Sequence, residues 1–350
     1  MNYVKIDDFK IGPNFPPFIV AEAGINHNGK ISTAFEMINL AKKSGANAIK
    51  FQTFKAEEFI ADPNEKYSYF SQGKEITESM LEMFKRCEFS DNEWLQIKQK
   101  CDEEKILFLS TPQNKSDLEL LMELGIPAVK VGSDDFTNIP LLKDYAATGL
   151  PLILSCGMSN LSEISQTLDA VGALKDYPTI LLLTTSQYPT PFKDVNLRKF
   201  ETLSNSFPMI PLGFSDHTQG HLASSLAVAF RACFFEKHFT LDNNFLGPDH
   251  WFSESPVGLR DWINSIKTSY EIMGSPIVKP TPEEEKMKKL VRRSIVALSD
   301  IEKGKKFDND NVGLKRPGTG LPPLYLSEIL GKKSTKNISK GTQIKLGDFS

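Results

Sequence analysis

The sequence lacks the features that mark exported, membrane-spanning and nucleic-acid-binding proteins. Residues 1–17 contain no apolar stretch of signal-peptide length, and no apolar run approaches the roughly 20 residues that cross a bilayer. The formal net charge of −3 provides no basic field for binding a polyanion. We therefore expect small-molecule partners, with no nucleic acid and no membrane among them.

Cysteine is also scarce. The four cysteines are scattered without CxxC or zinc-ligand spacing: Cys87, Cys101, Cys156 and Cys233. This pattern is typical of unpaired thiols in a reducing compartment and argues against a disulfide framework. We expect a cytoplasmic protein.

Short apolar runs rich in β-branched residues alternate with helical patterns. The run at 32–44, for example, has an apolar stripe that includes Ala34, Met37 and Ile38. An alternation of this kind predicts a parallel sheet covered by helices, and eight such units in about 270 residues favour a closed (β/α)8 TIM barrel over an open sheet. The predicted strands are 18–22, 48–53, 106–111, 128–132, 151–155, 179–185, 210–215 and 233–238.

The periodic pattern stops after the eighth unit. We predict a barrel domain over 1–274, a linker over 275–290 where three prolines adjoin a charge run, and a small β-rich domain over 291–350. An I-x-K-G-x-x-apolar unit occurs twice in that last segment, at 301 and at 338. The segment 56–86 is longer than a usual connection and is expected to form a lid or side wall.

Polar side chains stand where each predicted strand ends, which in a parallel barrel is the face that carries the active site. Each of them alone has an ordinary structural explanation, such as a turn residue or a helix cap. Together they would be costly to bury at one barrel mouth without an anionic ligand or a metal. The residues at or just after the ends of the predicted strands are Glu22, Asn26, Lys50, Gln52, Ser110, Thr111, Lys130, Ser133, Asp135, Ser155, Gly157, Ser186, Tyr188, Ser215, Asp216, His217, Glu236 and His238.

Two lysines with a rim of hydroxyl groups suit a phosphate or a carboxylate. His217 and His238 lie about one barrel unit apart, so both imidazoles can meet one divalent ion and leave positions open for substrate. Glu22 could transfer a proton or orient a water molecule. The pair formed by His217 and His221 has helical spacing, but Gly220 makes that stretch a turn, and we interpret His221 as structural.

Short motifs that span the chain occur in this order: "AEAGINHNG", "AIKFQT", "STP", "VKVGSDD", "SCGM", "YPTP", "GFSDHT", "EKHFT", "GPDH" and "KRPGTG". With this series of motifs, the chain resembles the sialic acid synthase family, the phosphoenolpyruvate-dependent nonulosonate synthases, over essentially its full length. This resemblance implies a TIM barrel followed by an antifreeze-like (SAF) domain, a domain-swapped homodimer, and a divalent metal, commonly Mn²⁺, with Mg²⁺ or Co²⁺ also suited to the ligands.

The resemblance also implies roles for individual residues. Glu22, Lys50 and Lys130 would be catalytic, and His217 and His238 would be the metal ligands. Phosphoenolpyruvate would be held by Lys50, Thr111, Lys130, Ser133, Ser155, Ser186 and Ser215. The N-acetylated amino sugar would contact Gln52, Asp135, Tyr188, Asp249 and, from the partner subunit's C-terminal domain, a copy of Arg316.

Two positions depart from the family pattern. Asp134 and Asp135 stand where many members read Gly-Glu, so the sugar-contacting carboxylate is one methylene shorter. Ser186 replaces an asparagine amide, and its hydroxyl can still donate a hydrogen bond. The expected product is N-acetylneuraminate from N-acetylmannosamine, and a diacetamido-trideoxy sugar giving legionaminate or a related acid is the alternative. Pseudaminate is less favoured.

Different classes of protein remain open from the residues alone. A Schiff-base aldolase also places lysines at strand ends, but it needs no metal and releases no phosphate. A sugar-binding protein without catalysis would not need two lysines facing two histidines. A barrel-type metal-dependent hydrolase is weaker, because the first strand has no HxH pair. We interpret Glu22 as catalytic and expect Asn26, His27 and Asn28 to shape the turn that follows it.

Overall fold

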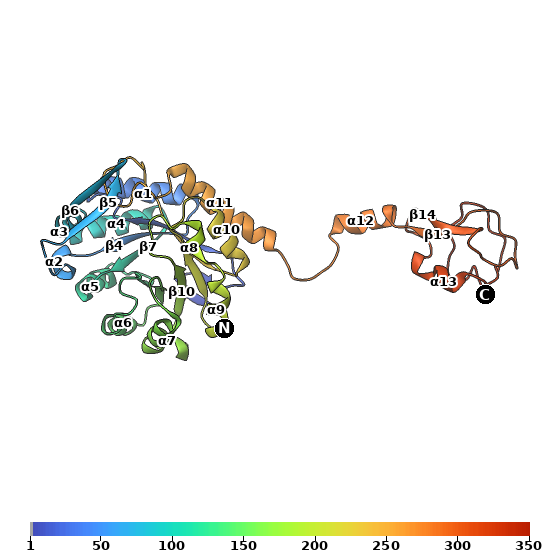
Figure 1. Ribbon diagram of the computed structural model, residues 1–350, viewed down its shortest axis with the longest axis horizontal. Helices are drawn as coiled ribbons and strands as arrows, with labels where there is room; N and C mark the ends of the chain where they lie inside the picture. The colour runs from blue at the N-terminus through green and yellow to red at the C-terminus, as the bar shows by residue number, and fades with distance from the viewer. Residues whose placement is uncertain (1–2) are drawn as a thin grey trace. The chain divides into compact units, whose positions relative to one another are not determined.

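A sheet of eight parallel strands forms the centre of the barrel domain (Figure 1). Its strand order is β7-β4-β3-β12-β11-β10-β9-β8, and β7 also lies beside β8, so the sheet curves round into a barrel. All eight predicted strands are confirmed in this computed structural model, which describes residues 3–350. Their bounds are β3 (Phe18–Gly24), β4 (Ala48–Thr53), β7 (Leu107–Pro112), β8 (Val129–Val131), β9 (Leu152–Ser155), β10 (Thr179–Thr184), β11 (Leu212–Ser215) and β12 (Phe234–His238).

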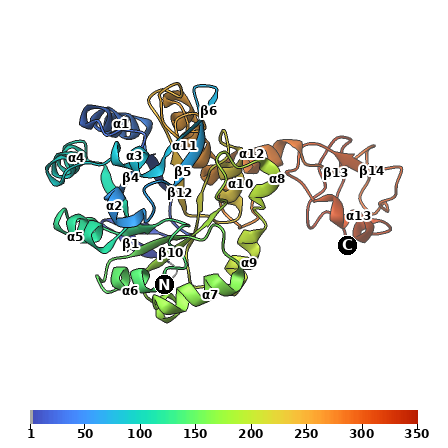
Figure 2. The same cartoon turned by 60° about the vertical axis from the view of Figure 1, so that its left-hand side comes forward.

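Each barrel strand is followed by a helix that covers the outside of the sheet, and Figure 2 shows several of these helices around the strands. Local signals set their ends: a capping box of Ser90 and Glu93 starts α4, and Gly45, with φ of 89°, ends α1. The helices are α1 (Ile31–Ser44), α4 (Asp91–Glu103), α5 (Lys115–Glu123), α6 (Ile139–Ala146), α7 (Leu161–Ala170), α9 (Lys199–Ser206), α10 (Leu222–Ala229) and α11 (Pro256–Met273). The expected TIM-barrel architecture is therefore confirmed.

Two apolar cores hold the barrel together. The larger lies between the strands and the helices, and the smaller fills the interior of the barrel. The interior core includes residues of an N-terminal hairpin, β1 (Val4–Ile6) and β2 (Phe9–Ile11), packed with Phe18 and Phe234. The end of the barrel at which the strands begin is thus filled with hydrocarbon, which leaves the opposite end for polar chemistry.

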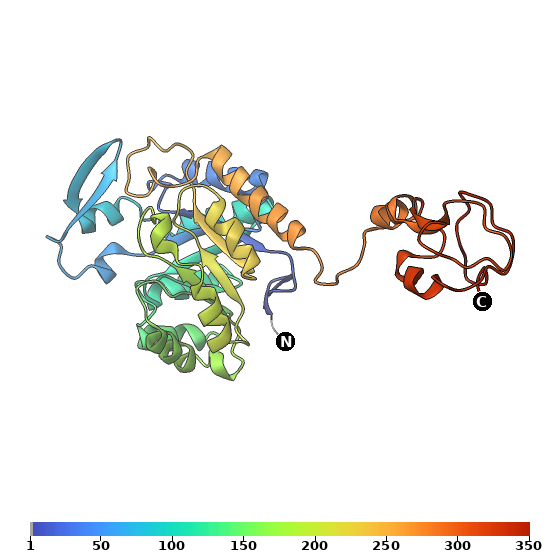
Figure 3. The same cartoon turned by 45° about the vertical axis from the view of Figure 1, so that its right-hand side comes forward.

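The long connection after β4 folds into an insertion with α2 (Ala56–Phe59), β5 (Lys66–Ser71), β6 (Lys74–Ser79) and α3 (Met80–Lys85). Strands β5 and β6 form an antiparallel hairpin, seen in light blue in Figure 3. The tip of the hairpin meets the loop after β12, where Gln72 Nε2 donates to the carbonyl of Asn244 at 2.9 Å. Two segments distant in sequence are therefore tied together at the strand-exit side of the barrel.

The first compact unit ends at Gly274, and the second comprises Ser275–Ser350. The second unit contains β13 (Ser294–Ala297) paired with β14 (Val312–Lys315), α13 (Leu326–Ile329) and a separate apolar core. The two copies of the I-x-K-G repeat pair with one another: Ile301 and Ile338 exchange backbone hydrogen bonds of 2.8 Å in each direction. Both isoleucines are buried in that core.

The segment expected to be a linker contains a helix that the sequence analysis did not predict. Residues Pro282–Val291, most of which we assigned to the linker 275–290, form helix α12. Thr281 and Glu284 make a capping box, and Lys286 and Lys288 pair with Glu283 and Glu285 three residues earlier. The charge run thus supports a helix through local pairing, although none of its residues is buried.

Across residues 3–350 there is no helix with the length and apolar character needed to cross a membrane.

The barrel interior has no room for a side chain at Gly213 on β11. A Cβ atom there would lie 2.5 Å from Leu182 Cδ2 and 2.6 Å from the carbonyl oxygen of Phe234. We predict that Gly213→Ala lowers the free energy of unfolding by about 1–3 kcal/mol, because the neighbouring strands must separate. Chemical denaturation measures this loss. Glu119→Ala, at an exposed position of α5, is the control and should leave stability within about 0.5 kcal/mol.

Candidate active site

The inward-facing side chains change from apolar to polar close to the ends of the strands. Successive side chains of a strand point to opposite faces, so residues two apart share a face. On β3, Val20 lies in the interior apolar core and Glu22 follows it. The same change from apolar to polar occurs from Ala48 to Lys50, Leu109 to Thr111, Ala128 to Lys130, Ile153 to Ser155 and Phe234 to Glu236. A polar layer therefore lies directly above a hydrocarbon layer.

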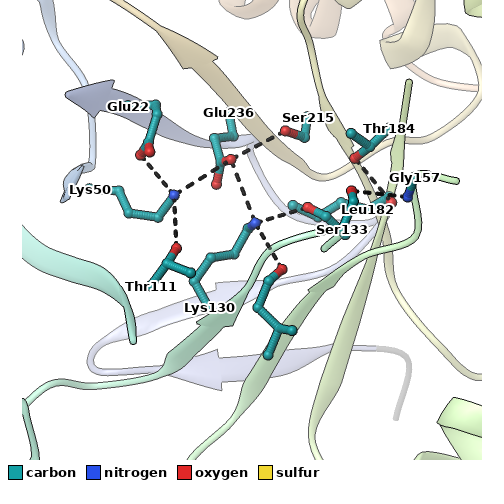
Figure 4. A network of polar contacts seen from close by, with 12 residues as sticks. Glu22, Lys50, Thr111, Lys130, Ser133, Gly157, Leu182, Thr184, Ser215 and Glu236 are labelled. Atoms are coloured by element: carbon teal, nitrogen blue, oxygen red, sulfur yellow. Dashed lines mark hydrogen bonds and ion pairs between the residues drawn. The ribbon is translucent and has the colours of Figure 1, made fainter. Parts of the chain in front are cut away.

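Lys50 joins two of the predicted residues. Its Nζ is 2.8 Å from Glu22 Oε2 and donates to Thr111 Oγ1 at 3.2 Å (Figure 4). The strand register places Glu22 and Lys50 at the same height along the barrel axis, because the two residues are partners across β3 and β4. All three residues are buried.

Lys130 lies on the other side of the same layer. Its Nζ donates to Ser155 Oγ at 2.8 Å and to the carbonyl oxygen of Val131 at 3.1 Å. Lys130 is 3% exposed and Ser155 is 2% exposed, so water does not screen this contact.

Glu236 lies between the two lysines (Figure 4). Its Oε1 is 3.8 Å from Lys50 Nζ and 3.7 Å from Lys130 Nζ, and it accepts a hydrogen bond of 3.2 Å from Ser215 Oγ. Its other oxygen, Oε2, is buried without a hydrogen-bond partner. Glu236, to which the sequence analysis gave no role, therefore lies at the centre of the network.

Burial and ion pairing shift the pKa values of these groups in different directions. Burial lowers the pKa of Lys130, whereas at Lys50 the attraction of Glu22 and Glu236 outweighs burial and raises the pKa. Burial raises the pKa of Glu22 above its usual range despite the opposing effect of Lys50. At Glu236 burial also acts upward, but Lys130 and Lys50 outweigh it and the pKa is lowered. Glu236 is therefore the permanent carboxylate of the layer, and Glu22 is the group suited to holding a proton.

Ser133 and Ser186 approach one another over Gly157. A Cβ atom at Gly157 would lie 2.6 Å from Ser133 Oγ and 2.4 Å from Ser186 Oγ. The backbone N–H of Gly157 donates to Ser133 Oγ at 3.1 Å, and Ser186 Oγ is buried without a partner. Glycine is needed here because only a residue without a side chain lets both hydroxyl groups come so close. The two hydroxyls make a pair of donors suited to an anion, and the N–H of Gly157 orients the hydroxyl of Ser133.

The two predicted metal-ligating histidines are neighbours, with ring centroids 5.6 Å apart. His217 Nδ1 contacts the carbonyl oxygen of Thr185 at 2.9 Å, which leaves Nε2 for a ligand. His238 Nδ1 is buried without a hydrogen-bond partner and lies 3.8 Å from Asp249 Oδ2. Burial lowers the pKa of His217 to about 4 and that of His238 well below its usual value, so both imidazoles are neutral at pH 7.

Two neutral imidazoles, one with an unsatisfied nitrogen, fit the donor set of a divalent transition metal. Within residues 3–350 no group of three or more His, Cys, Asp or Glu side chains is arranged to hold a metal ion. A metal held at His217 and His238 would therefore take its remaining ligands from substrate and water, as open catalytic sites do.

The predicted sugar-contacting residues occupy different surroundings. The ring of Tyr188 is 4.2 Å from that of His217 and Tyr188 is 47% exposed, so it borders the histidine pair. Gln52 is the register partner of Thr111 at the ends of β4 and β7. Asp135 accepts a hydrogen bond of 2.9 Å from Asn138 Nδ2 at the start of α6. Arg316 belongs to the second unit, follows β14 and is exposed.

The turn after Glu22 is fixed by its own polar side chains. Asn26 Nδ2 donates to the carbonyl of Phe239 at 2.8 Å, and His27 Nδ1 accepts from the N–H of Gly29 at 3.1 Å. Asn28 has a φ of 52°, in the left-handed region that asparagine tolerates. These contacts link the turn to the loop after β12. His221 precedes α10 and is exposed.

A second buried ion pair supports the loop that carries His217. Lys237 Nζ is 3.1 Å from Asp216 Oδ2, and Glu254 Oε1 is 3.8 Å away. Asp216 also accepts from Ser224 Oγ at 2.6 Å, while its other oxygen accepts from the N–H and the hydroxyl of Thr218 at 2.8 Å. Because these bonds use both oxygens of its carboxylate, Asp216 supports the site by holding the loop.

Fold and site together define a TIM-barrel enzyme with a buried ionic layer. The comparisons identify its relatives. The NeuB family profile matches residues 37–278, and the SAF domain profile matches residues 292–350. The N,N'-diacetyllegionaminic acid synthase of Campylobacter jejuni is 40% identical over 93% of this chain and 98% of its own length, and that of Legionella pneumophila is 38% identical over 95% and 94%.

A solved structure agrees with these matches. The N-acetylneuraminic acid (sialic acid) synthetase of Leptospira borgpetersenii superposes with a TM-score of 0.73 at 34% identity, covering 81% of this chain and 94% of the other. The chain belongs to the NeuB family and carries a C-terminal SAF domain. The resemblance expected from the motifs is confirmed, and the protein is an enzyme of the nonulosonate synthase type.

We predict that Asp216→Asn lowers the free energy of unfolding by about 3 kcal/mol or more, because the buried ammonium of Lys237 loses its nearest counter-charge. Urea denaturation followed by circular dichroism measures the change. Asp102→Asn is the matched control: its carboxylate pairs with Lys98 but is 62% exposed, so the cost should stay below about 1 kcal/mol. Equal losses in the two variants would contradict the supporting role of Asp216.

Proposed function

We propose that the enzyme condenses phosphoenolpyruvate with the open-chain form of an N-acetylmannosamine-type sugar and releases phosphate. The observation that carries this proposal is the arrangement of Lys50 and Lys130 on either side of Glu236, with Ser133, Ser155 and Ser186 nearby. Two ammonium groups and several hydroxyls suit a small molecule that bears both a carboxylate and a phosphate.

We propose that phosphoenolpyruvate is held by the residues expected from the resemblance: Lys50, Thr111, Lys130, Ser133, Ser155, Ser186 and Ser215. The contacts among Lys50, Thr111, Lys130, Ser155 and Ser215 support a single site for them. Lys50 is a poor nucleophile for a Schiff base, because its raised pKa and its ion pair with Glu22 keep it charged.

A divalent metal such as Mn²⁺, with Mg²⁺ or Co²⁺ as other possibilities, would be held by His217 and His238 and would supply Lewis-acid polarisation of the acceptor aldehyde. Glu22 would give a proton to the aldehyde oxygen as the new carbon–carbon bond forms, in keeping with its raised pKa. Water then adds to the former enol carbon, and the intermediate loses phosphate. Gln52, Asp135, Tyr188 and Asp249 would contact the sugar.

Two acceptor sugars are candidates. N-acetylmannosamine, giving N-acetylneuraminate, is the one expected from the motifs and is supported by the similarity to the Leptospira synthetase. A 2,4-diacetamido-2,4,6-trideoxymannose, giving N,N'-diacetyllegionaminate, is favoured as the second by the identities of 38% and 40% to the two legionaminic acid synthases. Asp135 in place of glutamate is the residue that we propose distinguishes the acceptor.

We also propose a domain-swapped homodimer in the cytoplasm. The exposed position of Arg316 supports a contact between this residue and the sugar in a second copy's barrel. All four cysteines are unpaired and buried, in keeping with a reducing compartment.

The first test removes metal with a chelator and then supplies phosphoenolpyruvate with each sugar, with and without Mn²⁺. We expect phosphate release and a product of the corresponding nonulosonate mass only when metal and a suitable sugar are both present. Mass spectrometry of the product then identifies the acceptor. Turnover that survives the chelator would favour a Schiff-base aldolase, and binding of sugar without turnover in folded, metal-loaded protein would favour a sugar-binding protein.

A second prediction concerns Glu22. Glu22→Gln should lower kcat by about 10²–10⁴-fold, because the amide cannot transfer the proton. Steady-state assays of phosphate release measure the loss, and Glu119→Gln on the exposed side of α5 is the control. Near wild-type turnover in Glu22→Gln would remove Glu22 from the proposed mechanism.

A further inference from the structure

The residues that precede the two predicted metal ligands carry opposite charges and form an ion pair. Asp216 stands directly before His217, and Lys237 stands directly before His238. Lys237 Nζ lies 3.1 Å from Asp216 Oδ2, and the two residues are 2% and 0% exposed. Successive side chains of a strand alternate, so Lys237 points away from the interior that Glu236 and His238 face. The ion pair therefore joins the backbone segments that carry the histidines from outside the site.

The main-chain ladder ends before it reaches His217. Pairing between β11 and β12 runs to Ser215 and Glu236, and a bond of 2.8 Å from the N–H of Asp216 to the carbonyl oxygen of Glu236 follows it. His217 lies in the loop beyond β11, whereas His238 is the last residue of β12. Side-chain contacts must therefore hold the segment of His217 against the strand of His238.

The two histidines have different neighbours in the barrel. The ring of His217 contacts the carbonyl oxygen of Thr185, and its own carbonyl oxygen accepts from the N–H of Thr190 at 2.8 Å, both in the loop after β10. His238 lies against β3, where Glu22 is its register partner. One ion can use both imidazoles only if their nitrogens converge on a single point, so a link between the two segments is required.

Lys237 makes this link through several contacts. Its ammonium donates to the carbonyl oxygen of Thr218, so the groups that it contacts flank His217 on both sides. Glu254 Oε1 lies 3.8 Å from the same ammonium, and the N–H of Glu254 donates to the carbonyl oxygen of His238 at 2.9 Å. One buried ammonium thus connects the segments of both histidines.

The helices behind the barrel anchor the ion pair. Asp216 Oδ2 accepts from Ser224 Oγ on α10 at 2.6 Å, and Trp262 Nε1 on α11 donates to the same hydroxyl at 2.8 Å. Ser224 and Trp262 are both fully buried. The position of the pair is therefore set by packed helices and by a strand.

We propose that Asp216 and Lys237 are positioning residues that set the separation of His217 and His238 and thereby the affinity of the enzyme for its divalent metal. The inference rests on the proposed function, in which these two histidines hold the metal. Asp216 and Lys237 act through the backbone. Contacts that orient metal ligands typically contribute about 10–100-fold to metal affinity. This role is additional to stabilising the fold, because it predicts a loss of metal affinity that does not follow the loss of stability.

The test compares Asp216→Asn, Lys237→Met and the double variant that combines them. Removal of one partner leaves a buried charge without its counter-charge, whereas replacement of the whole pair by neutral groups of similar size is often tolerated. We therefore expect the double variant to unfold at a higher urea concentration than either single variant. The Kd for Mn²⁺ should nevertheless be raised in all three by about 10–100-fold, because each of them lacks the ion pair.

Electron paramagnetic resonance measures this Kd without any turnover, since it detects free Mn²⁺ during titration of the metal-depleted full chain with Mn²⁺ alone. Circular dichroism identifies the variants that are folded, and one folded variant is sufficient for the comparison with the wild type. The matched control combines Asp102→Asn with Lys98→Met, which removes an ion pair of the same residue types on α4 whose carboxylate is 62% exposed. Its Kd for Mn²⁺ should stay within about twofold of the wild type.

Two results would overturn the inference alone: a wild-type Kd for Mn²⁺ in a folded variant that lacks the ion pair, or a Kd that recovers in the double variant together with stability. Absence of Mn²⁺ binding to the wild-type protein, or binding that survives His217→Ala, would instead overturn the metal site of the proposed function, and this inference with it. The two kinds of failure are distinguishable, because the first requires a wild-type protein that binds Mn²⁺ through His217.

Discussion

The site depends on the sharing of one carboxylate by two buried ammonium groups. Lys50 and Lys130 are each 2–3% exposed, and charges so far from water persist only where counter-charges and hydrogen bonds replace hydration. Glu236 lies within 4 Å of both ammonium groups. Main-chain bonds of the ladder β12-β3-β4 fix Glu236, Glu22 and Lys50, and Lys130 stands on β8 of the same sheet, so the arrangement does not depend on a flexible loop.

The barrel mouth contains two ionic networks with different tasks. In the first, Lys130 and Glu22 have shifted pKa values, and Glu236 and Ser186 have buried atoms without partners. In the second, each oxygen of Asp216 has two donors. Unsatisfied groups characterise the part of the mouth where we propose that substrate binds, and satisfied groups characterise the part that supports a loop.

The sequence was sufficient for the strands and for the polar residues gathered at their ends, because apolar runs followed by polar residues recur with the period of a barrel. The sequence was less informative where contacts between distant segments determine which side chains lie close together. The role of Glu236 depends on its distance from two lysines on other strands, although the alternation of Phe234, Glu236 and His238 already indicates that it points inward. The closeness of Ser133 and Ser186 depends on Gly157, which no local pattern reveals. By contrast, the missed helix α12 had a visible signal, since Thr281 and Glu284 have capping-box spacing.

The separation of a hydrocarbon layer from an ionic layer by only two residues makes strand alignment decisive for activity. A slip of one residue in β3 or β4 would turn Glu22 or Lys50 toward the helices and bring an apolar side chain into the polar layer. Such a misaligned chain would lose hydrophobic burial and charge pairing at once, so it could not persist as a stable but inactive barrel. The residues that we propose for the chemistry therefore also contribute to the correct alignment of the strands.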